Sequence, residues 1–390
     1  MTRQNHTEPR QRFDHEILVL QGGGALGAYH AGVFEGMVEA HRSPSWVVGV
    51  SIGAITSALI AGNAPSMRVE RLRAFWERVS AYAPFAWPSS LEAMRPAYNA
   101  LSAGAVAAFG SPGFFTPRVP PPFFVLGGGP AATSFYDTSP LQATLEELVD
   151  FDRINHGDVR ISLGAVNVRT GASTYFDSRR TRIGPEHVMA SGALPPGFPA
   201  VEIDGEQYWD GGIVSNSPLS YVWDEKPLTT ALIVQVDLFK PIGELPTNID
   251  EVLERHKDIQ YASKQRFNVD HVKQIGELRG ALIRLIDKLP PRLRNDPDAK
   301  RLASLCDGRE WSVVRLVNER LAHVSQTKDY EFSRATVDEH WAAGLEDVRR
   351  AVANRDVMTP NKLLPGVSVY EPALARGAAP RVERQAKKTQ

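Results

Sequence analysis

Two short apolar runs alternate with two helix-like segments near the start of the chain. The runs EILVLQ (16–21) and WVVGV (46–50) are rich in β-forming residues, and helix-like sequences follow them at 28–41 and 52–62. Strands joined by a helix in so short a span lie parallel and are connected by a right-handed crossover. This start therefore predicts an α/β fold, with a mainly parallel central sheet covered by helices on both faces.

The rest of the chain continues this pattern with two interruptions. Further strands are predicted at 159–168, 173–178, 231–239 and 311–317. Residues 84–135 are rich in Pro, Gly and Phe and show little periodicity, whereas residues 248–305 look helical. We expect three regions: a core over 14–240, a mostly helical C-terminal region over 241–365 packed on that core, and a flexible tail over 366–390.

Residues 273–294 carry an apolar stripe at helical spacing. The stripe consists of Ile275, Leu278, Leu282, Leu285 and Leu289. Six basic residues border it, as in helices that lie on anionic membranes. Most such stripes pack against their own domain, so we expect intramolecular packing with only weak membrane contact.

Composition excludes several classes of protein. The formal net charge of −1 argues against a nucleic-acid partner, which would favour a basic chain. The single cysteine, Cys306, cannot form an internal disulfide, and the polar N-terminus lacks the apolar centre of a signal peptide. We therefore expect a cytoplasmic protein, peripheral to a membrane at most. No His, Cys and carboxylate cluster has ligand spacing, so no metal and no cofactor is expected; the sequence predicts no oligomeric state.

The loop GGGALG (22–27) follows the first predicted strand and opens a helix. It satisfies the G-x-G-x-x-G pattern of dinucleotide-binding proteins. That use also needs an acidic residue near the end of the second strand, where this chain has Ser51 and no carboxylate nearby. A nucleotide-binding function is therefore disfavoured. Backbone N–H groups of such a loop can equally stabilise the oxyanion of an acyl-transfer intermediate.

Ser51 lies in GVSIG (49–53), which matches G-x-S-x-G between a predicted strand and a predicted helix. Gly49 and Gly53 permit the crowded turn that would expose the serine hydroxyl. A serine at a helix start can also be a simple N-cap. The strand–turn–helix context and the neighbouring glycine loop favour a nucleophile.

A nucleophilic serine needs a base, and the sequence contains two kinds of candidate. Asp210 precedes Gly211 and Gly212 and follows a predicted strand, and Asn216 lies in the same polar loop. A Ser–His–Asp hydrolase would instead use a histidine late in the chain. By position, the histidine candidates are His256, His271, His323 and His340, although their surroundings are helical or charged.

Four motifs in this order carry a resemblance: QGGGALGAYHAG, GVSIG, ASGALPPGFPAV and DGGIVSNSPL. Over about residues 16–240 the chain resembles the patatin-like phospholipases, acyl-ester hydrolases with a three-layer α/β fold. The resemblance implies Ser51 as nucleophile and Asp210 as base. It implies an oxyanion hole of backbone amides from Gly22, Gly23, Gly24, Ala25 and Gly27. Leu26 departs from many relatives, which have Arg or Lys there.

The expected function is therefore lipid or other acyl-ester hydrolysis by a Ser–Asp dyad. Two alternatives stay open: a catalytically weak lipid-binding or scaffold protein on the same fold, and a Ser–His–Asp hydrolase. The stretches KDYEFSR (328–334) and HWAAG (340–344) are similar to a C-terminal region of one bacterial subgroup, for which we expect a packing or interaction role.

Two hypotheses remain for the irregular segment 84–135. Its aromatic side chains could line or cover an acyl channel and touch a membrane surface, or form a loop packed passively on the core. These side chains are Phe85, Trp87, Phe109, Phe114, Phe115, Phe123 and Phe124.

Overall fold

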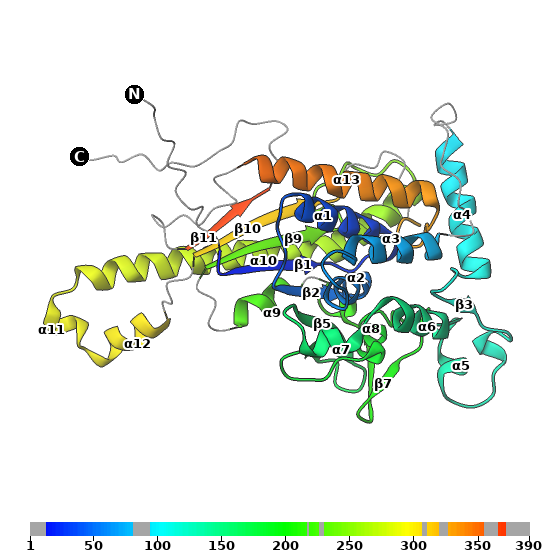
Figure 1. Cartoon of the computed structure of the whole chain (residues 1–390), viewed down its shortest axis with the longest axis horizontal. Coiled ribbons are helices and arrows are strands. Elements are labelled where there is room, and N and C mark those ends of the chain that lie inside the picture. Colours follow the sequence, from blue (N-terminus) through cyan, green and yellow to red (C-terminus); the bar gives the residue numbers. More distant parts are fainter. Residues whose placement is uncertain are drawn as a thin grey trace.

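The computed structural model describes residues 13–80, 94–216, 218–225, 230–305, 310–319, 327–354 and 366–371 (Figure 1). Within them, nine strands form one mixed sheet. Six neighbouring strands of this sheet, β11, β10, β9, β1, β2 and β5, run parallel to one another. The strand order is β11 (Gly366–Tyr370), β10 (Glu310–Val317), β9 (Thr230–Asp237), β1 (His15–Leu20), β2 (Trp46–Val50), β5 (Arg160–Asn167), β8 (Glu206–Asp210), β7 (Val201–Ile203). Strand β6 (Ser173–Asp177) pairs antiparallel with β5.

Helices cover both faces of the sheet, which confirms the predicted α/β class. One face packs against α1 (Ala28–Glu39), α2 (Ile52–Ala61) and α13 (Arg334–Ala353), with α3 (Arg68–Val79) beside them. The other face packs against α9 (Leu219–Asp224) and part of α10 (Ile249–Lys288). The parallel strands β1 and β2 are buried along nearly their whole length, which explains why they are continuous apolar runs.

The smaller elements lie around this core. Helices α6 (Ser139–Leu148), α7 (Phe151–His156) and α8 (Pro185–Ser191) surround the β5–β8 side of the sheet (Figure 1). The segment after α3 contains α4 (Arg95–Phe109), β3 (Thr116–Pro117), a 3₁₀ turn at Pro122–Phe124, α5 (Pro130–Thr133) and β4 (Tyr136–Asp137). Residues 84–135 show little periodicity in the sequence, yet α4 is a helix of 15 residues within them. Its alanines supply helix propensity without a strong apolar stripe, so periodicity did not reveal it.

The C-terminal region adds two strands to the same sheet as the core. Strand β10 pairs with β9 over its whole length, and β11 pairs with β10. Residues 366–370 were expected to begin a flexible tail; they form β11 instead, because the parallel edge of β10 offers them hydrogen-bond partners. Cys306 and residues 372–390 lie outside the described residues.

The second half of α10 is only partly packed. Ile275 contacts the sheet face beside Val367, but Leu278 and Leu285 are 60% and 57% exposed. Here the helix extends beyond the sheet and turns back through α11 (Pro291–Arg294) and α12 (Pro297–Leu305), as Figure 1 shows. The stripe was expected to pack within the chain, and it does so in part: Ile275 packs on the sheet and Leu282 and Leu289 are half-buried, whereas Leu278 and Leu285 face solvent.

Candidate active site

Ser51 occupies a tight turn between β2 and α2. Its backbone has φ 57° and ψ −125°, a conformation that L-residues rarely adopt. Two glycines make the turn possible: a Cβ on Gly49 would lie 2.2 Å from the Gly53 carbonyl oxygen, and one on Gly53 would lie 2.5 Å from that of Leu20. The Ser51 side chain makes no N-cap hydrogen bond. Such a turn presents the hydroxyl above the end of the strand.

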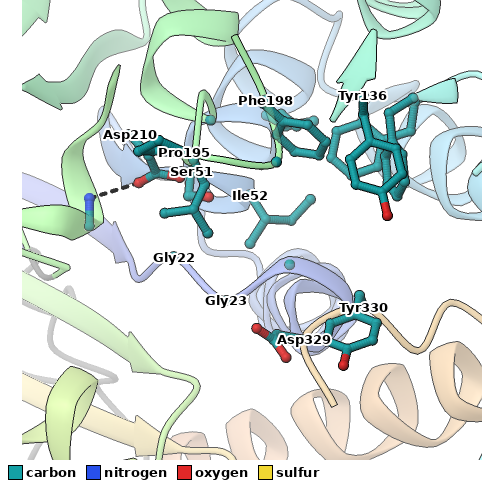
Figure 2. Close-up of a pocket in the computed structure, with 18 of the residues that line it drawn as sticks. Gly22, Gly23, Ser51, Ile52, Tyr136, Pro195, Phe198, Asp210, Asp329 and Tyr330 are labelled. Carbon is teal, nitrogen blue, oxygen red and sulfur yellow. Dashed lines mark hydrogen bonds between the residues drawn. The ribbon is translucent and has the colours of Figure 1, made fainter. Parts of the chain in front are cut away.

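Asp210 ends β8, which pairs with β5, the strand next to β2. The pairing brings its carboxylate beside Ser51 (Figure 2). Gly212 N–H donates to Asp210 Oδ1 at 2.7 Å. Burial raises the pKa of Asp210 to about 6, although hydrogen bonds from the Ser51 hydroxyl and Gly212 N–H act in the opposite direction. The site therefore holds a weakly basic carboxylate against a serine hydroxyl.

The glycine loop lies next to Ser51 and is held by Asn216. The Asn216 side chain accepts from Gly22 N–H at 3.1 Å and donates to the Gly22 carbonyl at 2.9 Å. Gly22, Gly23 and Gly24 line the cavity beside Ser51. Within the described part of the chain, the N–H groups of Gly23 and Gly24 make no hydrogen bond.

The other two predicted members of the loop do not line the cavity. Ala25 N–H donates to the Asp329 carbonyl at 2.8 Å, so that amide is already occupied. Gly27 is buried against Ile52 of α2, where a Cβ would lie 2.5 Å from the Ile52 side chain. Gly211 similarly packs against the Gly164 backbone on β5. These small residues serve close packing around the site.

Ser51 and Asp210 line a cavity of about 480 Å³ whose walls are mainly apolar. Its aromatic side chains come from several distant parts of the chain: Phe114, Phe115, Tyr136, Phe198, Phe239, Tyr261, Tyr330 and Phe332. Phe115 packs between Tyr136 and Phe198, with ring centroids 4.9 and 5.1 Å away. The cavity thus suits a largely apolar molecule whose reactive group reaches Ser51.

The irregular segment contributes to this cavity, but not through all of its aromatics. Phe114 and Phe115 are buried in the wall, as is part of α4 at Val106. Phe109, Phe123 and Phe124 are 68–82% exposed. Phe85 and Trp87 lie outside the described residues.

Residues 329–332 contribute to the site, which the sequence did not predict. Asp329, Tyr330 and Phe332 line the cavity. Figure 2 shows Asp329 and Tyr330 beside the glycine loop. The KDYEFSR stretch was recognised, but nothing in it indicates which part of the core it contacts.

The described late histidines do not line the cavity. His256 is exposed on α10, and His340 is buried on α13, where its Nδ1 contacts the Asn318 amide at 2.9 Å. Burial, together with the nearby cations, lowers the pKa of His340 to about 3. The side chain of His271 and the whole of His323 lie outside the described residues.

Two models of known protein families match this chain. A family model described as patatin-like phospholipase matches residues 18–223, more than half of the 390 residues. The chain belongs to the patatin-like phospholipase family. A second model, described as patatin phospholipase, matches residues 259–362. Membership of this family implies lipid acyl hydrolysis, and both the core and the C-terminal region carry a family match.

Several solved structures are similar to this chain at low sequence identity. VipD from Legionella pneumophila is 13% identical, with a TM-score of 0.36, and the match covers 90% of this chain and 72% of VipD. The type III effector protein ExoU is 14% identical, with a TM-score of 0.32, and the match covers 89% of this patatin-like chain and 54% of ExoU. ExoU in complex with SpcU, from the type III secretion system of Pseudomonas aeruginosa, has a TM-score of 0.29 at 14% identity, covering 75% and 61% of the two chains. Among curated proteins, no sequence matches significantly.

Proposed function

We propose that this protein is a serine acyl-ester hydrolase of the phospholipase A type. The observation that carries the proposal is the Ser51 hydroxyl held beside the buried Asp210 carboxylate in an aromatic-walled cavity. Ser51 Oγ attacks the ester carbonyl carbon while its proton passes to Asp210. The N–H groups of Gly23 and Gly24 are the oxyanion donors that the geometry leaves available.

The second half of the reaction uses the same groups. Asp210 returns the proton to the departing alcohol, so the carbon–oxygen ester bond breaks and an acyl-Ser51 intermediate remains. Water then attacks this intermediate and gives its proton to Asp210. That proton passes to Ser51 Oγ as the acyl–serine bond breaks, which releases the fatty acid and restores the serine hydroxyl and the carboxylate. A carboxylate with an ordinary pKa of about 3.9 would accept the serine proton poorly, and burial improves it as a base.

A lipid-binding protein without turnover would keep the same cavity. To distinguish an ester hydrolase from such a binding protein, we would measure the acid that the purified chain releases from a short p-nitrophenyl ester and from phospholipid vesicles. Turnover that disappears with Ser51 supports the enzyme, and binding without turnover supports the alternative.

The pH dependence of turnover should report on Asp210. Because only the ionised carboxylate accepts the serine proton, kcat/KM should fall about tenfold per pH unit below pH 6 and level off above about pH 7. We expect this from initial rates on a soluble short ester between pH 4 and 9. A profile that stays flat down to pH 4.5 would contradict a buried carboxylate base.

The same pKa has a consequence for stability. Since the folded-state pKa of Asp210 exceeds its unfolded value, its favourable contribution to folding is complete at low pH and is lost as pH rises through 6. Asp210→Asn should therefore increase the free energy of unfolding at pH 8 by roughly 1–3 kcal/mol. Urea unfolding of the wild type and of Asp210→Asn at pH 8 measures this difference in the free energy of unfolding. A variant less stable than wild type would contradict the destabilisation of the Asp210 carboxylate by burial.

We also propose that the surface around α4 and the following loop touches the membrane that contains the substrate. This surface carries six exposed apolar side chains: Leu101, Phe109, Val119, Phe123, Phe124 and Leu126. Between residues 94 and 135 the only charged residues are Arg95 and Arg118. Arg95 is buried, and Arg118 lies 3.8 Å from Asp137. The same segment supplies the cavity wall, so an acyl chain could pass from the bilayer into the cavity.

Replacing Phe123, Phe124 and Leu126 with serine tests this surface. Exposed apolar side chains of this size contribute a few kcal/mol each when they leave water, so binding to phosphatidylcholine vesicles should weaken at least about tenfold. Hydrolysis of a soluble short ester should stay within about twofold, because none of the three lines the cavity. The matched control replaces the exposed Leu278 and Leu285 of α10 with serine. Equal losses in both variants would show that this surface has no special role.

A further inference from the structure

Segment 327–333, which precedes α13, contacts the glycine loop through its backbone. The Asp329 carbonyl accepts the hydrogen bond from Ala25 N–H at 2.8 Å. A Cβ on Gly24 would lie only 1.9 Å from the same carbonyl oxygen. Asn216 holds Gly22 on the other side. The amides of Gly23 and Gly24 therefore lie between two fixed points, one from the core and one from the C-terminal region.

Three ion pairs attach this segment to α10. Lys328 Nζ lies 2.6 Å from Asp258 Oδ1, and both side chains are about 95% buried. Glu254 lies 3.3 Å from the same ammonium group. Lys257 pairs with Asp329 at 2.7 Å, in a partly exposed position. A buried ion pair adds little net stability, because desolvation offsets the attraction, but its geometry is specific.

Segment 327–333 is also braced internally. The buried Glu331 carboxylate accepts hydrogen bonds from Ser333 N–H at 2.9 Å and Ser333 Oγ at 3.0 Å. Ser333 in turn is the N-cap of α13. A displacement at Lys328 would therefore move the Asp329 carbonyl against the glycine loop.

We propose that segment 327–333 positions the glycine loop for catalysis, with Lys328 and Asp258 as positioning residues. The inference rests on the proposed function and extends it, because it gives the C-terminal region a part in the reaction. The Gly23 and Gly24 amides must point at the oxyanion of the transition state, and one such donor is worth about 10²- to 10³-fold in kcat. Loss of the Lys328–Asp258 ion pair, which we call the anchor, should therefore lower kcat more than it changes KM.

The test is the double variant Lys328→Met/Asp258→Leu, which replaces a buried ion pair by apolar side chains and leaves no unpaired charge at these two positions. With a soluble short ester, kcat should fall at least about tenfold while KM changes about twofold or less. Lys328→Arg, which keeps the cation, should retain most of kcat. The matched control is Arg42→Met/Glu16→Leu, an ion pair near the opposite end of β1, which should leave kcat unchanged.

A second measurement does not depend on turnover. Hydrogen exchange of a peptide covering residues 20–30 should be faster in the anchor variant than in wild type, and unchanged in the control variant. If the double variant does not fold, Lys257→Met at the partly exposed pair should give the same effects in weaker form.

The outcomes separate this inference from the proposed function. Ser51-dependent turnover in wild type, with normal kcat and normal exchange in folded anchor variants, overturns the positioning role alone. Absence of Ser51-dependent turnover in wild type contradicts the proposed function, and the exchange measurement then still decides whether the segment orders the loop.

Discussion

Ser51→Ala and Asp210→Asn should each reduce ester turnover at least about 10³-fold, and the double variant should be no worse than either. The two groups act on one proton, so removing either partner removes the same step. Asp210→Asn keeps the shape of the side chain and its oxygen acceptor for Gly212 N–H, so a loss there reports on proton transfer. Initial rates on a short p-nitrophenyl ester measure the effect, with circular dichroism confirming that each variant is folded.

Histidine variants provide the control for this prediction. A Ser–His–Asp hydrolase would need one of the late histidines, so His256→Ala, His271→Ala, His323→Ala and His340→Ala should be compared. We expect turnover to survive in each variant that folds, with His340→Ala the one to check for stability because that side chain is buried in α13. A folded histidine variant without turnover would refute the dyad. Retained turnover in Ser51→Ala would make that serine a structural residue of the turn.

Gly32→Ala should strongly destabilise the protein by separating α1 from α13. A Cβ at this position would lie 1.9 Å from the Trp341 carbonyl oxygen and 2.9 Å from Leu345 N. Both atoms belong to the α13 backbone, so they cannot rotate away as a side chain could. Figure 1 shows the two helices packed side by side on one face of the sheet. We expect a loss of about 3 kcal/mol in the free energy of unfolding.

Gly104→Ala in α4 is the matched control for this change. It is the same substitution in another helix, and its Cβ would have no neighbour within 4 Å. Alanine has the higher helix propensity, so this variant should gain up to about 1 kcal/mol. Urea unfolding followed by circular dichroism measures both variants. If Gly32→Ala were as stable as Gly104→Ala, the close approach of α13 to α1 would be wrong.

Local sequence determined much of this fold. The strand predictions at 16–21, 46–50 and 231–239 agree with β1, β2 and β9 within two residues at either end. Strands buried on both faces must be apolar along their length, so the signal is contained in a few consecutive residues. The turn around Ser51 was predictable for a similar reason, because its two glycines and the flanking strand and helix are contiguous.

Other features of the site depend on residues that are distant in the chain. Five amides were predicted for the oxyanion hole. Those of Gly23 and Gly24 remain available, because Gly22 N–H donates to Asn216 and Ala25 N–H donates to the Asp329 carbonyl. The α4 helix was missed because it has no marked apolar stripe, and β11 was missed because its hydrogen bonds depend on an edge of β10.

The sequence by itself determined the α/β class, the family and the candidate pair Ser51 and Asp210, because each is carried by short motifs with local physical requirements. Only the tertiary structure decided that the C-terminal region belongs to the same sheet and reaches the cavity. The Asp329 carbonyl meets Ala25 across about 300 residues of chain, and β10 and β11 extend the sheet beyond β9. Backbone hydrogen bonds of this kind carry no side-chain signature, since any residue supplies the same carbonyl and amide groups.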